Sequence, residues 1–169
     1  MTADALEIPY EDVIILPLDT SHSPDGGVTC ASRMTYSVGN SVLLASQMLL
    51  SQIKTEAGKY LKADPSVIRY EGGFIINGNT PIPVKELLSR LAEEDIKIEA
   101  TATFSFPYGP ETPDHLPFGM PHVLFCFGAH VVRIEVDPLL GKVEVKDVCA
   151  IHDVGKVIHR QAVEGQIEG

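Results

Sequence analysis

The sequence contains no tryptophan, only three cysteines and far fewer basic than acidic residues. Lys and Arg total 13 against 23 Asp and Glu, and the resulting net charge of −10 argues against nucleic acid or an anionic membrane surface as a partner. No run approaches the roughly 20 apolar residues of a membrane-spanning helix. The acidic N-terminal stretch also lacks the basic region of a secretory signal peptide. We therefore expect a cytoplasmic protein with no membrane contact.

The cysteines and histidines form no recognisable metal or disulfide pattern. Cys30, Cys126 and Cys149 are odd in number and none belongs to a C-x-x-C pair, so neither a disulfide scaffold nor a zinc site is expected. We predict that Cys126 and Cys149 are small buried apolar residues, and unpaired thiols fit a reducing compartment. The six histidines show no i, i+4 pair, so only the fold could assemble a metal cluster from them.

The remaining composition is that of a globular protein. Hydrophobic residues make up 44% and charged residues 21% of the 169 residues, which is enough chain to bury a true core. We predict an α+β fold in which a mixed or antiparallel sheet packs with two principal helices. Because both ends resemble interrupted helices, residues 1–169 are expected to be a single partial domain of a longer polypeptide.

Hydrophobic periodicity and turn residues predict the individual elements. Apolar residues at three- and four-residue spacing predict helices over 37–63 and 83–95, with helical turns over 2–7 and from Ala162 onward. Apolar runs and alternation predict strands over 13–18, 67–70, 74–76, 96–106, 123–136 and 143–151. The proline-rich segment 107–121 is predicted to be a long loop.

A short segment of small residues, Asp25-Gly-Gly-Val-Thr-Cys-Ala-Ser-Arg33, raises the question of a ligand. Its backbone N–H groups could approach a bound molecule closely, and Thr29 and Ser32 add hydroxyl donors ahead of a helix. The segment is neither a Walker A loop nor a G-x-G-x-x-G dinucleotide loop. On spacing alone, an ordinary loop with Ser37 as the N-cap of the helix is favoured.

A second polar segment lies at the end of the sequence, in Gly165-Gln166-Ile167-Glu168-Gly169. The side-chain amide of Gln166 offers two donors and an acceptor, so it could bind the edge of a polar ring. The first turns of a helix explain the same residues equally simply, and on spacing alone this second interpretation is favoured.

Two separated segments resemble one protein family. The stretches SPDGGVTCASRMTYSVGNSV and FGAHVVRIEVDPLLGKVEVKDVCAIHDVGKVIHRQAVEGQIEG are similar to the molybdopterin-binding large subunit of the xanthine dehydrogenase and aldehyde oxidase family. These enzymes are molybdenum hydroxylases. The resemblance covers most of the chain and is weakest over 64–122. It implies that the chain is a fragment of the molybdopterin-binding domain of that subunit.

The resemblance also implies a site and a reaction. Thr29, Cys30, Ala31 and Ser32 would pack against the pterin beside the molybdenum pocket, Gln166 would be a second contact, and the strand starting at Gly128-Ala129-His130 would approach the cofactor. Enzymes of this family hydroxylate a carbon of an N-heterocycle or an aldehyde with oxygen from water, using the redox chemistry of the molybdenum-molybdopterin cofactor. Electrons leave through iron–sulfur clusters and FAD on other domains or subunits, which would be the partners of this chain.

The chain also departs from the family pattern. The catalytic glutamate of the family lies downstream of Gly169 and a Gly-Gln-Gly cofactor loop lies upstream of Met1. No catalytic residue and no metal ligand is therefore assigned, and the chain is expected to be inactive alone. Leu18-Asp19-Thr20 stands where Gly-Asp-Thr is usual, and His159-Arg160 stands where Asn-Pro is usual. Arg33 and Met34 are interpreted as ordinary variation.

Two other interpretations remain open at this point. The chain could be a stand-alone, non-catalytic α+β binding or assembly module that keeps the fold, and such a module would be monomeric with polar ends. A cut fragment would instead expose apolar surface, and it could self-associate into a homo-oligomer to cover it. A small-molecule enzyme with its site in the loop 107–121 is a third interpretation, with no motif behind it.

Overall fold

The computed structural model describes residues 1–17, 19–21, 23–30, 32–106 and 125–169. The chain divides into two compact units, an N-terminal unit of residues 1–106 and a C-terminal unit of residues 107–169. The described parts combine helices with antiparallel sheets, which confirms the α+β prediction. The proline-rich segment 107–121 lies outside the described residues.

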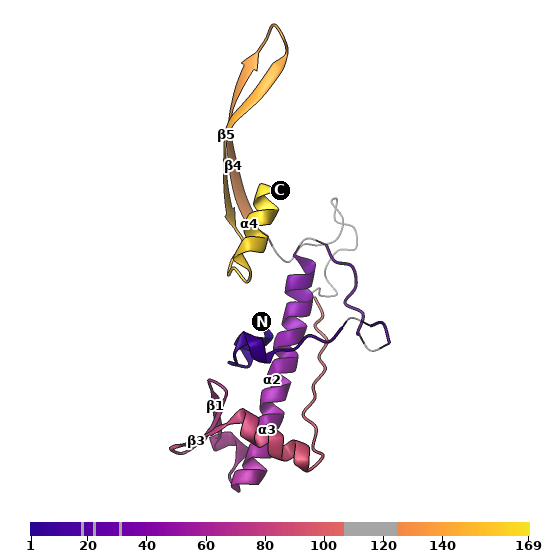
Figure 1. The fold of residues 1–169 in the computed structure, drawn as a ribbon, viewed down its shortest axis with the longest axis vertical. Coiled ribbons are helices and arrows are strands. Elements are labelled where there is room, and N and C mark those ends of the chain that lie inside the picture. The colour runs from indigo at the N-terminus through magenta and orange to yellow at the C-terminus, as the bar shows by residue number, and fades with distance from the viewer. Residues whose placement is uncertain (18, 22, 31, 107–124) are drawn as a thin grey trace, which may run out of the picture. The chain divides into compact units, whose positions relative to one another are not determined.

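The N-terminal unit combines two principal helices with a three-stranded sheet (Figure 1). Its elements are α1 (Thr2–Ala5), η1 (Tyr10–Asp12), α2 (Arg33–Leu61), η2 (Pro65–Val67), β1 (Arg69–Glu71), β2 (Phe74–Asn77), β3 (Thr80–Pro83) and α3 (Val84–Glu93). The sheet order is β1-β2-β3, with both pairs antiparallel. The strands predicted over 67–70 and 74–76 correspond to β1 and β2, whereas β3 was not predicted and ends at Pro83, where the sequence placed the start of a helix.

The core of the N-terminal unit lies between the C-terminal half of α2, the sheet and α3. Its buried apolar residues are Ile53, Ala57, Ile68, Ile75, Val84, Leu87 and Leu91. Burying a large aliphatic side chain of this kind contributes about 1.5–3 kcal/mol. The α3 stripe of Val84, Leu87 and Leu91 follows the three- and four-residue spacing that predicted this helix.

The end of α2 depends on a close approach of the backbone. Lys62 adopts a left-handed conformation, with φ 51°, and ends the helix. The chain then folds back so tightly that a Cβ atom on Gly58 would lie 2.9 Å from the carbonyl oxygen of Ala63 and from Cγ of Pro65. Only glycine fits this position without movement of the backbone.

Two predicted strands are not found among the described residues. Val13–Pro17 has no regular structure, and Ile14 and Leu16 are 82% and 68% exposed, because the structure describes no strand beside them. Residues 98–106 alternate between half-buried and exposed positions, as predicted, whereas Ile96, expected on the buried face, is exposed. However, this segment packs against α2 instead of a strand: Gln52 Nε2 donates to the carbonyl oxygen of Glu99 at 2.8 Å, and the Phe104 N–H donates to Ser41 Oγ at 3.1 Å.

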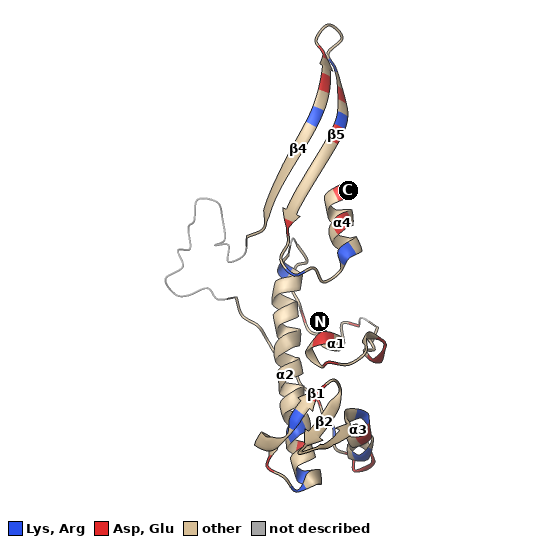
Figure 2. Cartoon of the chain, turned by 90° about the vertical axis from the view of Figure 1, so that its left-hand side faces the viewer, with Lys and Arg blue, Asp and Glu red and all other residues tan. Residues whose placement is uncertain are grey.

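The C-terminal unit contains a long hairpin, β4 (Phe127–Asp137) with β5 (Lys142–Asp153), followed by α4 (Arg160–Glu168). The register runs from Phe127 opposite Asp153 to Asp137 opposite Lys142, with an irregularity between Arg133 and Ile134. Charged residues gather in the half of the hairpin near its turn (Figure 2). Three ion pairs link them: Arg133–Asp147, Lys146–Glu135 and Lys146–Glu144.

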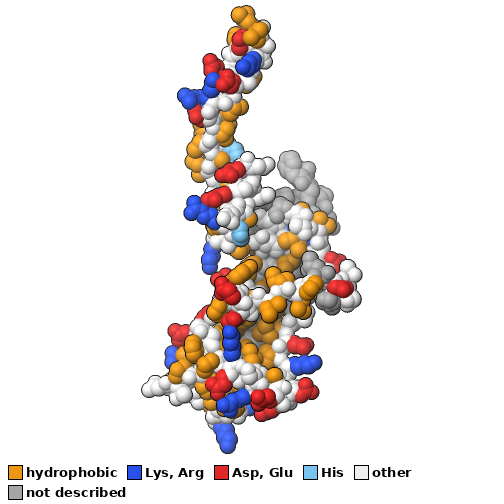
Figure 3. All heavy atoms as spheres, viewed as in Figure 1, with side chains coloured by type: hydrophobic (Ala, Val, Ile, Leu, Met, Phe, Trp, Pro, Cys, Tyr) orange, Lys and Arg blue, Asp and Glu red, His pale blue; other side chains and the backbone are white. Residues whose placement is uncertain are grey.

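The other half of the hairpin is apolar and exposed, and Figure 3 shows hydrophobic side chains along it. The prediction that Cys126 and Cys149 are buried is wrong, because both thiols are exposed. A two-stranded sheet needs a second layer to bury its side chains, and the described residues supply none over these positions. Within the described ranges, no helix combines the length and apolar character that crossing a membrane requires.

Candidate functional site

The loop ahead of α2 places Thr29, Cys30 and Ser32 at the surface of the N-terminal unit. Ala31, the fourth residue implied by the resemblance, lies outside the described residues. Ser32 occupies the N-cap position of α2 but forms no side-chain cap. Among the residues that the structure describes, neither the Thr29 nor the Ser32 hydroxyl has a hydrogen-bond partner. Within the described part of the chain, both hydroxyls are therefore available to bind a ligand.

The helix begins earlier than predicted. Ser37, expected as the N-cap, lies inside α2 and is buried, and its hydroxyl donates to the carbonyl oxygen of Arg33 at 2.8 Å. The first turn of α2 therefore follows directly on the small-residue loop, so the orphan N–H groups of that turn lie beside Ser32.

Arg33 holds the loop in place. Its Nη1 donates to the carbonyl oxygens of Gly26 and Val28, each at 2.9 Å. Asp25 Oδ1 accepts from the Gly27 N–H at 2.7 Å, which closes a turn just before. The interpretation of Arg33 as ordinary variation missed this contact. The available signal was an arginine shortly after two glycines, since its five donors need acceptors and a glycine loop exposes carbonyl groups.

A second turn closes the start of the loop. Asp19 Oδ1 accepts from the Ser21 N–H at 2.8 Å, and the Asp19 N–H donates to Ser23 Oγ at 3.2 Å. The backbone hydrogen bond from Ser21 is the main reason why the pKa of Asp19 is lower than usual. Asp19 thus stays ionised in its turn, while Leu18, the departure from the family pattern, lies outside the described residues.

Gln166 lies on α4 in the C-terminal unit, exposed beside the half-buried residues Val163 and Ile167. Its amide has no hydrogen-bond partner within the part of the chain that the structure describes. The helix is capped by His159, whose Nδ1 accepts from the Ala162 N–H at 3.0 Å. Asparagine would serve in the same role. The departure at His159 therefore still provides an N-cap for the helix that carries Gln166.

Two histidines that are distant in the sequence meet on the hairpin. The Nε2 atoms of His130 and His152 lie 2.6 Å apart, so one imidazole donates to the other. Gly128 stands opposite His152, and a Cβ atom there would lie 3.1 Å from His152 Nδ1. Sequence spacing could not reveal this pair, because it depends on strand register. The described residues contain no group of three or more His, Cys, Asp or Glu side chains that could hold a metal ion.

The donor set is chemically suited to a neutral polar ring. Thr29 and Ser32 offer hydroxyls and Gln166 offers an amide, all exposed and without a competing partner among the described residues. Such groups can both donate and accept, as the ring nitrogens and exocyclic groups of a pterin require. The loop belongs to the N-terminal unit and Gln166 to the C-terminal unit. The suitability for a polar ring is therefore argued for each of them separately.

Residues 1–169 match the family model of the molybdopterin cofactor-binding domain. The chain belongs to this family. It is 33% identical over 159 residues to a probable xanthine dehydrogenase subunit of Bacillus subtilis (strain 168), covering 94% of this chain and 20% of that protein. It is 26% identical over 172 residues to the nicotine 6-hydroxylase large subunit of Paenarthrobacter nicotinovorans, covering 100% of this chain and 20% of the relative.

The solved structures support the fold of this molybdopterin cofactor-binding chain. Quinoline 2-oxidoreductase from Pseudomonas putida 86 matches with a TM-score of 0.73 and 25% identity, over 98% of this chain and 21% of that one. A Cu,Mo-CO dehydrogenase matches with the same TM-score of 0.73 at 20% identity, which shows the fold alone. The chain spans about a fifth of the length of these relatives. The expected resemblance to the molybdopterin-binding subunit is confirmed.

Proposed function

We propose that this chain is a segment of the large subunit of a molybdenum hydroxylase, where it forms part of the site that holds the molybdenum-molybdopterin cofactor. The observation that carries the proposal is the match of the whole chain to the cofactor-binding domain family. Three relatives are named after nitrogen heterocycles: xanthine, nicotine and quinoline. An N-heterocycle is accordingly the first substrate class, with an aldehyde as the second, and the reaction is hydroxylation of a ring or carbonyl carbon.

The small-residue loop and Gln166 would bind and orient the cofactor. The hydroxyls of Thr29 and Ser32 would donate to its polar atoms, while Cys30 and Ala31 are small enough for the ring to approach the backbone. Gln166 would bind a ring edge through its amide. The bound cofactor supplies the redox chemistry. No general base is assigned to this chain, and the proposed role of its residues is to bind and orient the cofactor.

The proposed assembly is a multi-subunit enzyme of the cytoplasm. Two relatives are themselves named as subunits, one of a xanthine dehydrogenase and one of a nicotine 6-hydroxylase, which supports partner chains in general. Iron–sulfur and FAD domains or subunits are the proposed electron acceptors, and residues 1–169 are one partial domain within the molybdopterin-binding subunit. Neither nucleic acid nor a membrane is a proposed partner. Self-association into a homo-oligomer is the expected behaviour of the chain without these partners.

The first test is the molybdenum and pterin content of the holoenzyme that contains this chain. Thr29→Val removes a hydroxyl donor and Gln166→Ala removes the amide. Each is expected to lower cofactor affinity about tenfold, the effect of one lost hydrogen bond in a water-excluded site. Thr80→Val, on the exposed β3, and Gln161→Ala, elsewhere on α4, are matched controls. Unchanged molybdenum-to-protein ratios in both site variants would refute the proposed roles of Thr29 and Gln166 in cofactor binding.

The same measurement separates this proposal from the alternative. A stand-alone binding or assembly module would contain no pterin in any preparation, and its Thr29 and Gln166 variants would behave like their controls. A molybdopterin site would show pterin in the wild type and losses confined to the site variants.

A further inference from the structure

We infer that Arg33 is a positioning residue for the cofactor-binding loop, because it holds the backbone on both sides of Thr29. This inference rests on the proposed function, which makes the hydroxyl of Thr29 a cofactor ligand. The reasoning concerns only contacts within the N-terminal unit.

Arg33 contacts the loop at three points. Its Nη1 donates to the carbonyl oxygens of Gly26 and Val28, each at 2.9 Å, and its backbone N–H donates to the carbonyl oxygen of Cys30 at 3.0 Å. Val28 and Cys30 are the two neighbours of Thr29. One residue at the start of a 29-residue helix therefore fixes the peptide groups on either side of the proposed ligand.

The backbone of the loop is shaped around the guanidinium. Gly27, between the two bound carbonyl groups, has φ +71°, and a Cβ atom on it would lie only 2.7 Å from Arg33 Nη2. A side chain at this position would be strained and would push the guanidinium away. The glycine and the arginine thus form one structural unit, in which Gly27 allows the close approach that Arg33 uses.

No acidic side chain competes for Arg33 within the described residues. No ion pair of this arginine is found there, although Asp25 is close in the sequence. Asp25 instead binds the Gly27 N–H through Oδ1. Two donors of the guanidinium therefore bind carbonyl groups, and its planar geometry sets the separation of those groups more firmly than a flexible ammonium would.

A simple packing role is the competing explanation, since Arg33 Nη1 also lies 3.7 Å from Met34 Sδ. The two explanations differ in what they require of the side chain. Packing needs only the length and bulk of the stem. Positioning needs hydrogen-bond donors at its end. Arg33→Met keeps the stem without donors, whereas Arg33→Lys keeps donors with a looser geometry.

The test compares these variants in the holoenzyme, with Arg69→Met as a control on the exposed β1 of the same unit. Hydrogen–deuterium exchange of residues 25–30 reports the order of the loop, and pterin retained after dialysis reports cofactor binding. We expect Arg33→Met to accelerate exchange and pterin loss about tenfold each, as lost backbone anchors would. Arg33→Lys should retain most of both properties, and Arg69→Met should change neither. Gly27→Ala should resemble Arg33→Met, and it replaces that variant if Arg33→Met fails to fold.

Each other result has a definite meaning. Equal behaviour of Arg33→Met and Arg33→Lys would overturn the inference, since donors would not matter. Faster exchange with normal pterin retention in Arg33→Met, while Thr29→Val loses pterin, would overturn it as well and leave the proposed function intact. Normal retention in Thr29→Val would instead refute the proposed site, and the role of Arg33 toward the cofactor would be refuted with it.

Discussion

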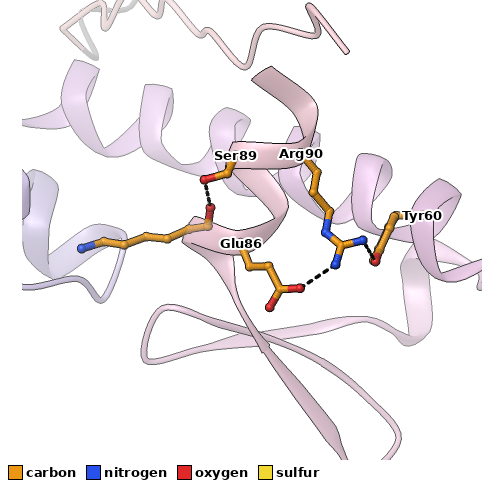
Figure 4. Close-up of polar contacts among 5 residues, drawn as sticks. Tyr60, Glu86, Ser89 and Arg90 are labelled. Carbon is orange, nitrogen blue, oxygen red and sulfur yellow. Dashed lines mark hydrogen bonds and ion pairs between the residues drawn. The ribbon is translucent and has the colours of Figure 1, made fainter. Parts of the chain in front are cut away.

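The guanidinium of Arg90 lies over the ring of Tyr60, with Cζ 4.8 Å from the ring centroid, and donates to the Tyr60 hydroxyl (Figure 4). Its Nη2 also donates to Glu86 Oε1 at 2.8 Å. The hydrogen bond to Glu86 is the main reason why the pKa of Arg90 is higher than usual. Tyr60 belongs to α2 and Arg90 to α3, so this cluster joins the two principal helices at the rim of the core.

Arg90→Met should lower the thermal unfolding midpoint of the chain slightly, by about 2 °C, because exposed ion pairs and cation–π contacts are weak in water. Circular dichroism during heating measures this change. Arg69→Met removes an equally exposed arginine from the same unit and should leave the midpoint unchanged. Equal shifts in the two variants would mean that the Tyr60 contact contributes nothing.

Leu87→Ala should destabilise the N-terminal unit by about 2–5 kcal/mol, the usual cost of deleting a buried leucine side chain. Leu87 is 2% exposed and belongs to the central core cluster. Urea denaturation measures the free energy of unfolding. Val67→Ala, at a position 57% exposed, is the control and should cost less than about 0.5 kcal/mol. A similar cost for both substitutions would contradict the assignment of the core.

The sequence alone predicted those helices and turns that depend only on residues close together in the chain. The three- and four-residue spacing in α3 and the glycine turns of the meander lie within a few residues of the structure they produce. The start of α2 was predicted too late, and the contact of Arg33 with the carbonyl groups of Gly26 and Val28 was missed as well. Hydrophobic periodicity does not predict a hydrogen bond between an arginine side chain and backbone carbonyl groups.

Other features of the site required knowledge of what packs beside a segment. The alternation over 96–106 was identified from the sequence, but period two cannot distinguish a neighbouring strand from the flank of α2. The pairing of His130 with His152 follows from the hairpin register, which the sequence does not state. Thr29 and Gln166 are proposed from family resemblance, since a hydroxyl and an amide in small-residue segments carry no distinctive spacing.

Tyr70 should make the N-terminal unit sensitive to alkaline pH. Its hydroxyl donates to the carbonyl oxygen of Leu6 at 2.6 Å, and burial, followed by the charge of Glu7, raises its pKa above the ordinary 10.0. The folded state therefore holds this proton more tightly than the unfolded state does. The stabilisation is complete below pH 10.0 and is lost as the pH rises from there through the raised pKa of the folded state.

The measurement is the unfolding midpoint as a function of alkaline pH. Tyr70→Phe should lower stability near neutral pH by about 1 kcal/mol, through loss of the hydrogen bond, and should flatten the alkaline decline. Tyr10→Phe, at a position 77% exposed, is the control and should keep the wild-type profile. An unchanged alkaline slope in Tyr70→Phe would show that another group causes the decline.

The imidazole of His159 should stabilise the first turn of α4, the helix that carries Gln166. His159 Nδ1 accepts from the Ala162 N–H at 3.0 Å, and the loss of such a cap costs about 1 kcal/mol of helix stability. His159→Ala should therefore speed hydrogen exchange at the Ala162 amide about fivefold, as the first turn frays. His159→Asn restores a short side-chain acceptor and should return exchange close to the wild-type rate. If both variants exchange at the same rate, the cap does not stabilise α4.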